Sequence, residues 1–104
     1  MIELAPAYMT EIRRILAEHV PDCKVFAFGS RVNGKARKHS DLDIVVVGSE
    51  ELDWWRLDKL KDAFSESDLP MIVDVLDWNS LSDEFRRVIL TNHEIIQQGS
   101  VKDE

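Results

Sequence analysis

The chain has 104 residues, a net charge of −7, 44% hydrophobic residues and one cysteine. This length and composition suit one globular domain and exclude a disordered or fibrous protein. The acidic charge disfavours bulk nucleic-acid binding, which needs a basic surface. The longest apolar run, residues 44–47, is far shorter than the roughly 20 residues of a membrane helix, and the N-terminus lacks the pattern of a secretory signal. We expect one cytoplasmic domain over residues 1–104, with a disordered tail at 100–104.

The first half of the chain predicts a helix followed by two strands. Apolar residues at helical spacing predict a helix over Pro6–His19. The β-branched and aromatic run Lys24–Phe28 predicts a strand that Gly29 ends. Residues 30–34 form a turn or a single helical turn, and residues 41–47 form a central strand covered on at least one face. The linker between the two strands allows either antiparallel pairing or a crossover.

The second half predicts two more helices and two more strands. Residues 52–64 form a helix with an inward stripe of Trp54, Leu57, Leu60 and Phe64. Residues 71–77 form a strand, residues 81–90 a helix capped by Ser80 or Asp83, and residues 94–97 a short edge strand. The expected fold is therefore α/β or α+β, with helices packed on a small mixed sheet of three to four strands.

Two aspartates separated by one residue stand at the start of the central strand. Because side chains alternate along a strand, Asp41 and Asp43 point to one face and Leu42 points to the other. Two carboxylates this close repel each other unless a cation lies between them. Oxygen ligands of this kind suit Mg²⁺, with Mn²⁺ as the alternative. For an isolated Asp-x-Asp pair, however, a simple turn cap is the more common explanation.

Several features of a phosphate-binding site precede this pair. Gly29 lets the backbone approach a phosphate closely, and Ser30 offers a hydroxyl and a backbone N–H near a helix start. A basic segment follows and provides countercharge: Arg31, Lys35, Arg37, Lys38 and His39. We predict that Gly29, Ser30, Arg31 and Lys38 bind a nucleotide. His39 is either a phosphate contact or an ordinary loop residue.

A third carboxylate comes from the strand at residues 71–77. Asp74 shares one face of that strand with Ile72 and Leu76, and it stands mid-strand between apolar neighbours, where an unpaired buried charge is costly. A metal ion or a substrate would explain this position. Asp77, at the end of the strand, is better explained as a cap for the following turn.

Gly29-Ser30, ten intervening residues and Asp41-Leu42-Asp43 together resemble the signature of the DNA-polymerase-β-like nucleotidyltransferase superfamily. The segments 29–34 and 40–44 resemble its small prokaryotic branch, the minimal nucleotidyltransferases. The resemblance implies a polymerase-β-like fold in which Asp41, Asp43 and Asp74 bind two Mg²⁺ ions and are catalytic. It also implies that Gly29 and Ser30 hold the triphosphate of ATP, and that an acceptor hydroxyl displaces pyrophosphate.

The minimal branch resembles the antitoxin half of two-component modules whose other half is a helical HEPN-type toxin. The resemblance implies transfer of AMP to a hydroxyl of that partner, with the acceptor supplied by the partner or the site shared in a homo-oligomer. Two alternatives stay open: a non-catalytic antitoxin that neutralises its partner by contact, and an adenylyltransferase acting on a small molecule such as an aminoglycoside. Mass gain on a protein, as against a small acceptor, separates them.

The remaining aromatic, histidine and cysteine residues have less specific interpretations. Trp55 falls outside the inward stripe of its helix, so we expect it to be either exposed at an interface or packed on the protein itself. His19 and His93 are expected to be structural or surface residues, and Cys23 a small core residue. The sequence shows no cluster of cysteines and histidines that would bind zinc.

Overall fold

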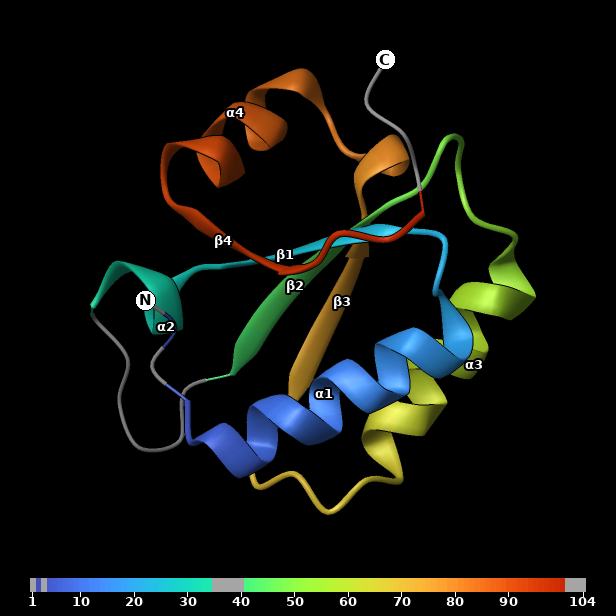
Figure 1. Cartoon of the computed structure of the whole chain (residues 1–104). Coiled ribbons are helices and arrows are strands. Elements are labelled where there is room, and N and C mark those ends of the chain that lie inside the picture. Colours follow the sequence, from blue (N-terminus) through green and yellow to red (C-terminus); the bar gives the residue numbers. More distant parts are fainter. Residues whose placement is uncertain (1, 3, 35–40, 101–104) are drawn as a thin grey trace.

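The computed structural model describes residues 2, 4–34 and 41–100. The elements, in chain order, are α1 (Pro6–His19), β1 (Lys24–Phe28), α2 (Ser30–Asn33), β2 (Leu42–Val47), α3 (Trp54–Ser65), β3 (Val73–Asp77), the 3₁₀ helix η1 (Trp78–Ser80), α4 (Asp83–Thr91) and β4 (His93–Gln97). These helices and strands confirm the predicted order (Figure 1). Residues 30–34 contain a helical turn, one of the two predicted possibilities.

The four strands form one mixed sheet in the order β3-β2-β1-β4. β1 pairs antiparallel with both β2 and β4, whereas β2 and β3 are parallel. The linker between β1 and β2 therefore returns the chain antiparallel rather than crossing over. This arrangement confirms the predicted small mixed sheet with helices packed on it, and it confirms β4 as an edge strand.

The main core lies between the sheet and the helices α1 and α3. These helices lie together on one side of the sheet, and α4 lies on the other (Figure 1). Side chains of β1 and β2 that point toward α1 and α3 are fully buried, as are the inward residues of the two helices: Val25, Ala27, Leu42, Ile44, Val46, Ile12, Leu16 and Leu60. The predicted inward direction of Leu42 and the burial of Cys23 are confirmed.

The opposite face of the sheet is covered only in part. Phe26 packs edge-on against Trp78 of η1 and against His93, with ring centroids 6.3 and 4.7 Å apart. Phe26 pairs with Val45, which is fully buried, and Val45 pairs with Leu76. This row is covered, whereas the next row, toward the start of β2, is more open and holds the candidate site.

Two local predictions were wrong. Trp54 is 79% exposed instead of inward, because α3 begins at this residue and Leu52, just before the helix, packs on the core in its place. The N-cap of α4 is Ser82, whose side chain accepts a hydrogen bond from the backbone N–H of Phe85, rather than Ser80 or Asp83. Trp55 is exposed, as one of its two interpretations expected.

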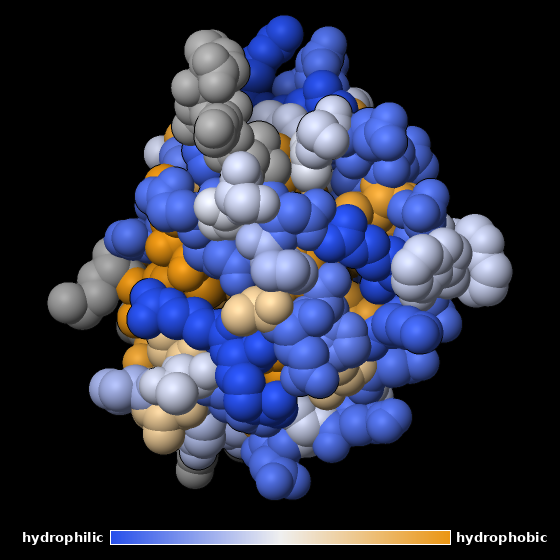
Figure 2. All heavy atoms as spheres, turned by 45° about the vertical axis from the view of Figure 1, so that its right-hand side comes forward, coloured by the Kyte–Doolittle hydropathy of each residue, from blue (hydrophilic) through white to orange (hydrophobic). Residues whose placement is uncertain are grey.

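The face of the molecule seen in Figure 2 is mainly hydrophilic, with hydrophobic residues in small separate areas. Exposed apolar residues on that face are ordinary, because single ones occur on most soluble surfaces. Among the described residues, no helix is long and apolar enough to cross a membrane. The tail prediction for residues 101–104 lies outside the described part of the chain.

Candidate active site

Asp43 and Asp74 lie side by side on the open part of the sheet. They are register partners on the neighbouring strands β2 and β3, so their side chains project from the same face. Asp41 directly precedes β2 and is exposed. We refer to Asp41, Asp43 and Asp74 as the acid cluster. The prediction that Asp74 shares a face with Leu76, opposite Val75, is confirmed by the strand register.

The cost of burial predicted for Asp74 is wrong, because the side chain is exposed. On this sheet face η1 covers the neighbouring row, and α4 reaches Phe28 at the β1 end of the same row but leaves Asp74 exposed, so a mid-strand position here does not mean a buried one. The reason to regard Asp74 as functional is therefore its position beside Asp43 rather than its desolvation.

The three carboxylates interact electrostatically. The pKa of Asp43 is raised above its ordinary value, first by partial burial and then by the negative charges of Asp74 and Asp41. The charges of Asp74 and Asp41 thus make ionisation of Asp43 less favourable. A bound cation would reverse this effect, since it favours the charged form of every carboxylate that faces it.

Gly29 brings the backbone of the β1–α2 turn against Asp43. Its dihedral angles are φ 83° and ψ −158°, a region open almost only to glycine. A Cβ atom at this position would collide with Oδ2 of Asp43. The sequence predicted that Gly29 is needed so that a phosphate can approach the backbone. The structure adds a second reason for glycine at this position, because the carboxylate of Asp43 also approaches the backbone closely.

The short helix α2 follows this turn directly. Its first residue is Ser30, its N-cap is Gly29, and the carbonyl of Gly29 accepts a hydrogen bond from the N–H of Val32. Gly29 and Ser30 therefore lie next to the acid cluster, as the motif predicted. Arg31 is only 8% exposed and so belongs to the packed part of this turn. Lys38, the other predicted contact of the nucleotide, and His39, for which two interpretations were open, lie outside the described residues.

The donor atoms of the acid cluster fit a hard divalent cation. They are carboxylate oxygens only, and Mg²⁺ is commonly held by one or two carboxylates together with substrate phosphates and water. Among the described residues, no group of three or more His, Cys, Asp or Glu side chains is arranged so that it could hold a metal ion by itself. A divalent cation at the acid cluster would therefore need further ligands, such as water or a substrate phosphate.

Asp77 has a structural role, as predicted. It is only 4% exposed, and its carboxylate accepts hydrogen bonds from the backbone N–H groups of Leu52 and Asn79 at 2.8 and 3.0 Å. These bonds join the end of β3 to the start of η1 and to the segment before α3. Asp77 points to the opposite face of β3 from Asp74, toward the helices, so it does not belong to the acid cluster.

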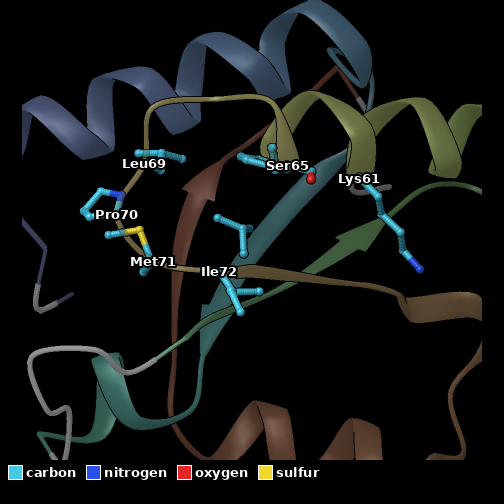
Figure 3. Close-up of a pocket in the computed structure, with 8 residues that line it drawn as sticks. Lys61, Ser65, Leu69, Pro70, Met71 and Ile72 are labelled. Carbon is cyan, nitrogen blue, oxygen red and sulfur yellow. The ribbon is translucent and has the colours of Figure 1, made fainter.

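A cavity of about 270 Å³ lies away from the acid cluster, between the second half of α3 and the segment that leads into β3. Leu69, Pro70 and Met71 line one side of it, and Lys61 extends from α3 on the other (Figure 3). Its lining includes none of the predicted site residues. This hollow is therefore separate from the candidate active site, which lies on the sheet face at Asp43 and Asp74.

Sequence reasoning missed the aromatic residues that flank the acid cluster. Phe28 is the register partner of Asp43 on β1, and Phe85 of α4 packs edge-on against Phe28 with ring centroids 6.0 Å apart. The pairing of β1 with β2 is needed to place Phe28 beside the acids, and the packing of α4 on β1 is needed to place Phe85.

Comparison with known proteins identifies the family of the chain. Residues 10–101 match the family described as Polymerase beta, Nucleotidyltransferase. A Haemophilus influenzae protein named "Probable protein adenylyltransferase MntA" is 52% identical over 87 residues, which are 84% of this chain and 76% of that protein.

Solved structures extend the likeness to the whole fold. A chain of a toxin–antitoxin crystal structure with AMP-PNP has a TM-score of 0.74 and 25% identity, covering 86% of this chain and 73% of that one. A chain from the complex of a tri-AMPylated Shewanella oneidensis HEPN toxin with an MNT antitoxin has a TM-score of 0.60 and 23% identity, covering 88% and 71%, which shows the fold alone. On the family match and the 52% identity, the chain belongs to the polymerase-β-type nucleotidyltransferase family.

Proposed function

We propose that this protein transfers AMP from ATP to a hydroxyl group of a HEPN-type toxin and thereby acts as its antitoxin. The observation that carries the proposal is the meeting of Asp43 and Asp74 on adjacent strands, with Asp41 beside them and the Gly29–Ser30 turn against Asp43. Support comes from the relative named a protein adenylyltransferase and from the toxin–antitoxin complex solved with AMP-PNP.

We assign Asp41, Asp43 and Asp74 as the residues that would hold two Mg²⁺ ions, with Mn²⁺ as a substitute. When bound, the ions neutralise phosphate charge and bring the reacting oxygens together. Gly29 and Ser30 present the backbone and hydroxyl to the triphosphate, and Arg31 and Lys38 supply positive charge. The charges of Asp74 and Asp41 help to raise the pKa of Asp43, so a bound cation would also relieve this repulsion.

The reaction makes one bond and breaks one. The acceptor oxygen bonds to the α-phosphorus, the bond from that phosphorus to the α,β-bridging oxygen breaks, and pyrophosphate leaves with the electron pair. The hydroxyl proton must be removed, and Asp74 is the carboxylate we assign to accept it. The protein otherwise acts by positioning its substrates, since phosphoryl chemistry needs little covalent participation from it.

Two alternatives make different use of the same surface. A non-catalytic antitoxin would bind its partner without transferring AMP, but such a protein gains nothing from carboxylates that repel one another. A small-molecule adenylyltransferase needs a pocket for its acceptor. The described residues place the acids on an open sheet face, which a protein acceptor can cover more readily than a small molecule can.

The test is intact-mass spectrometry of the protein mixed with ATP, Mg²⁺ and a HEPN-type toxin encoded by the neighbouring gene. We expect the toxin to gain the mass of one or more AMP groups and to lose ribonuclease activity. In the matched control, Asp41→Asn with Asp43→Asn should abolish the gain while the circular dichroism spectrum stays unchanged. Tight complex formation without any mass gain would instead support the non-catalytic antitoxin. A mass gain on a small acceptor alone would support the small-molecule adenylyltransferase.

A further inference from the structure

An apolar surface borders the acid cluster on the side of β1. Phe28 lies directly opposite Asp43 in the antiparallel pair, and side chains in this relation share a face with Cβ atoms about 5 Å apart. The ring of Phe85 meets the ring of Phe28 at an angle of 84°. The carboxylate of Asp43, the ring of Phe28 and the ring of Phe85 therefore follow one another across this face of the sheet.

The outer part of this surface is open to solvent. Phe85 is 37% exposed and Val88, one helical turn further along α4, is 60% exposed. Residues three apart lie on the same side of a helix, so Val88 extends the surface that Phe85 begins. Part of each side chain is therefore open to contact with a ligand.

The helix that carries these residues is held firmly in place. Ile89 is buried, and Arg86 donates a hydrogen bond to the carbonyl of Trp78 at 2.9 Å while its guanidinium lies 5.4 Å from the centre of the Trp78 ring. The N-cap of Ser82 fixes the start of the helix. Phe85 thus presents a ring of fixed position, which costs less entropy on binding than a mobile one.

We propose that Phe85 and Val88 form the surface on which the base of the nucleoside triphosphate lies. The inference rests on the proposed function, because it takes the triphosphate to lie at the acid cluster and the Gly29–Ser30 turn. A nucleotide is highly charged at one end and flat and apolar at the other. The structure offers the matching pair of surfaces side by side, with acids for a cation-bound triphosphate and an exposed aromatic ring for the base.

This mode of contact has a chemical consequence for substrate choice. An aromatic ring stacks on every base, and the contact grows with the area of the base. The Phe85 surface should therefore favour purines over pyrimidines by contact area, without strict discrimination between adenine and guanine. Stricter selection would need hydrogen bonds to the edge of the base.

The test compares binding of ATP with binding of inorganic tripolyphosphate, both with Mg²⁺, by calorimetry. Phe85→Ala should weaken ATP binding by roughly 5- to 100-fold, the range for loss of a base–aromatic contact, and leave tripolyphosphate binding unchanged. Phe85→Trp, which keeps an aromatic ring at this position, should bind ATP about as tightly as the wild type does. Val88→Ser, at a more exposed position where the fold is not at risk, should weaken ATP binding by a smaller factor.

Leu90→Ala is the matched control, because Leu90 is 48% exposed on the same helix but lies on the opposite side from Val88. It should change neither affinity. Equal weakening of ATP and tripolyphosphate by Phe85→Ala would show a structural role and overturn the inference, as would unchanged ATP binding. A change only in the KM for the protein acceptor would assign the surface to the acceptor instead.

AMP transfer by the wild-type protein is measured in parallel and separates the two proposals. If the wild type binds ATP without transferring AMP, the proposed function fails while the base surface is still tested by binding. If transfer proceeds normally and Phe85→Ala binds ATP as the wild type does, the base surface fails alone. If the wild type binds no ATP, both fail.

Discussion

Two aspartates on β3, three residues apart, have opposite surroundings. Asp77 is buried, and both of its carboxylate oxygens accept hydrogen bonds from backbone N–H groups. Asp74 is exposed and lies beside Asp43, whose pKa its charge helps to raise. The carboxylate of Asp77 accepts hydrogen bonds from two donors, whereas the carboxylate of Asp74 lies beside another carboxylate.

This difference separates a residue that stabilises the fold from one that serves a site. A buried carboxylate supplied with donors adds to stability, and its loss leaves those donors unsatisfied. Carboxylates placed against one another reduce stability, and such local conflicts are concentrated at functional sites. The comparison therefore predicts that changes at the two positions affect different properties of the protein.

The largest expected effect is on activity at Asp74. Asp74→Asn should reduce the rate of AMP transfer by about 10²-fold or more, the usual contribution of a general base. The free energy of unfolding should change by less than about 0.5 kcal/mol, as for other exposed positions. The measurements are single-turnover transfer to the toxin and urea denaturation. A variant with normal transfer would remove Asp74 from the site.

The next effect is on stability at Asp77. Asp77→Ala should lower the free energy of unfolding by about 2 kcal/mol, because the N–H groups of Leu52 and Asn79 lose their acceptor in a buried place. The transfer rate per folded molecule should be unchanged. Asp68→Ala, at an exposed position before β3, is the control and should leave stability nearly unaltered. If the Asp77→Ala protein is as stable as the wild type but inactive, the assignment of a structural role to Asp77 is wrong.

The sequence was sufficient for the parts of the fold that depend on local pattern. Helical spacing predicted α1 at its observed bounds, and alternation along β3 placed Asp74 and Asp77 on opposite faces. The Gly-Ser and Asp-x-Asp motifs were also local, so the acids and the Gly29–Ser30 turn could be named before the structure was known. What these patterns share is that neighbours in the chain determine them.

The parts that could not be predicted depend on contacts between distant segments. Alternation shows which side chains share a face but not what covers that face, so the exposure of Asp74 required the position of α4. Trp54 was expected inside because it fits the stripe of α3, yet the helix begins there and the residue extends past the core. The contact of Phe85 with Phe28 likewise required the packing of α4 on the sheet.

The smallest expected effect sharpens the comparison at Asp43. A raised pKa means that the folded protein binds this proton more tightly than the unfolded chain does, so ionisation of Asp43 destabilises the fold. Without divalent cations and near neutral pH, Asp43→Asn should therefore increase the free energy of unfolding by about 0.2–1 kcal/mol, the range for a like-charge pair on adjacent strands. The measurement is urea denaturation in EDTA as a function of pH.

The pH dependence of the stability gained by Asp43→Asn shows whether repulsion between the carboxylates causes it. Well below the ordinary aspartate pKa of about 3.9, the wild-type carboxyl is protonated in both states, so the two proteins should be equally stable. The difference in stability should appear as pH rises through the raised pKa of Asp43. Asp58→Asn, on the exposed side of α3, should show no such difference. Adding Mg²⁺ should stabilise the wild type more than Asp43→Asn, because only the wild type keeps the full acid cluster. If the difference in free energy of unfolding persists at low pH and does not change with Mg²⁺, repulsion within the acid cluster is not its cause.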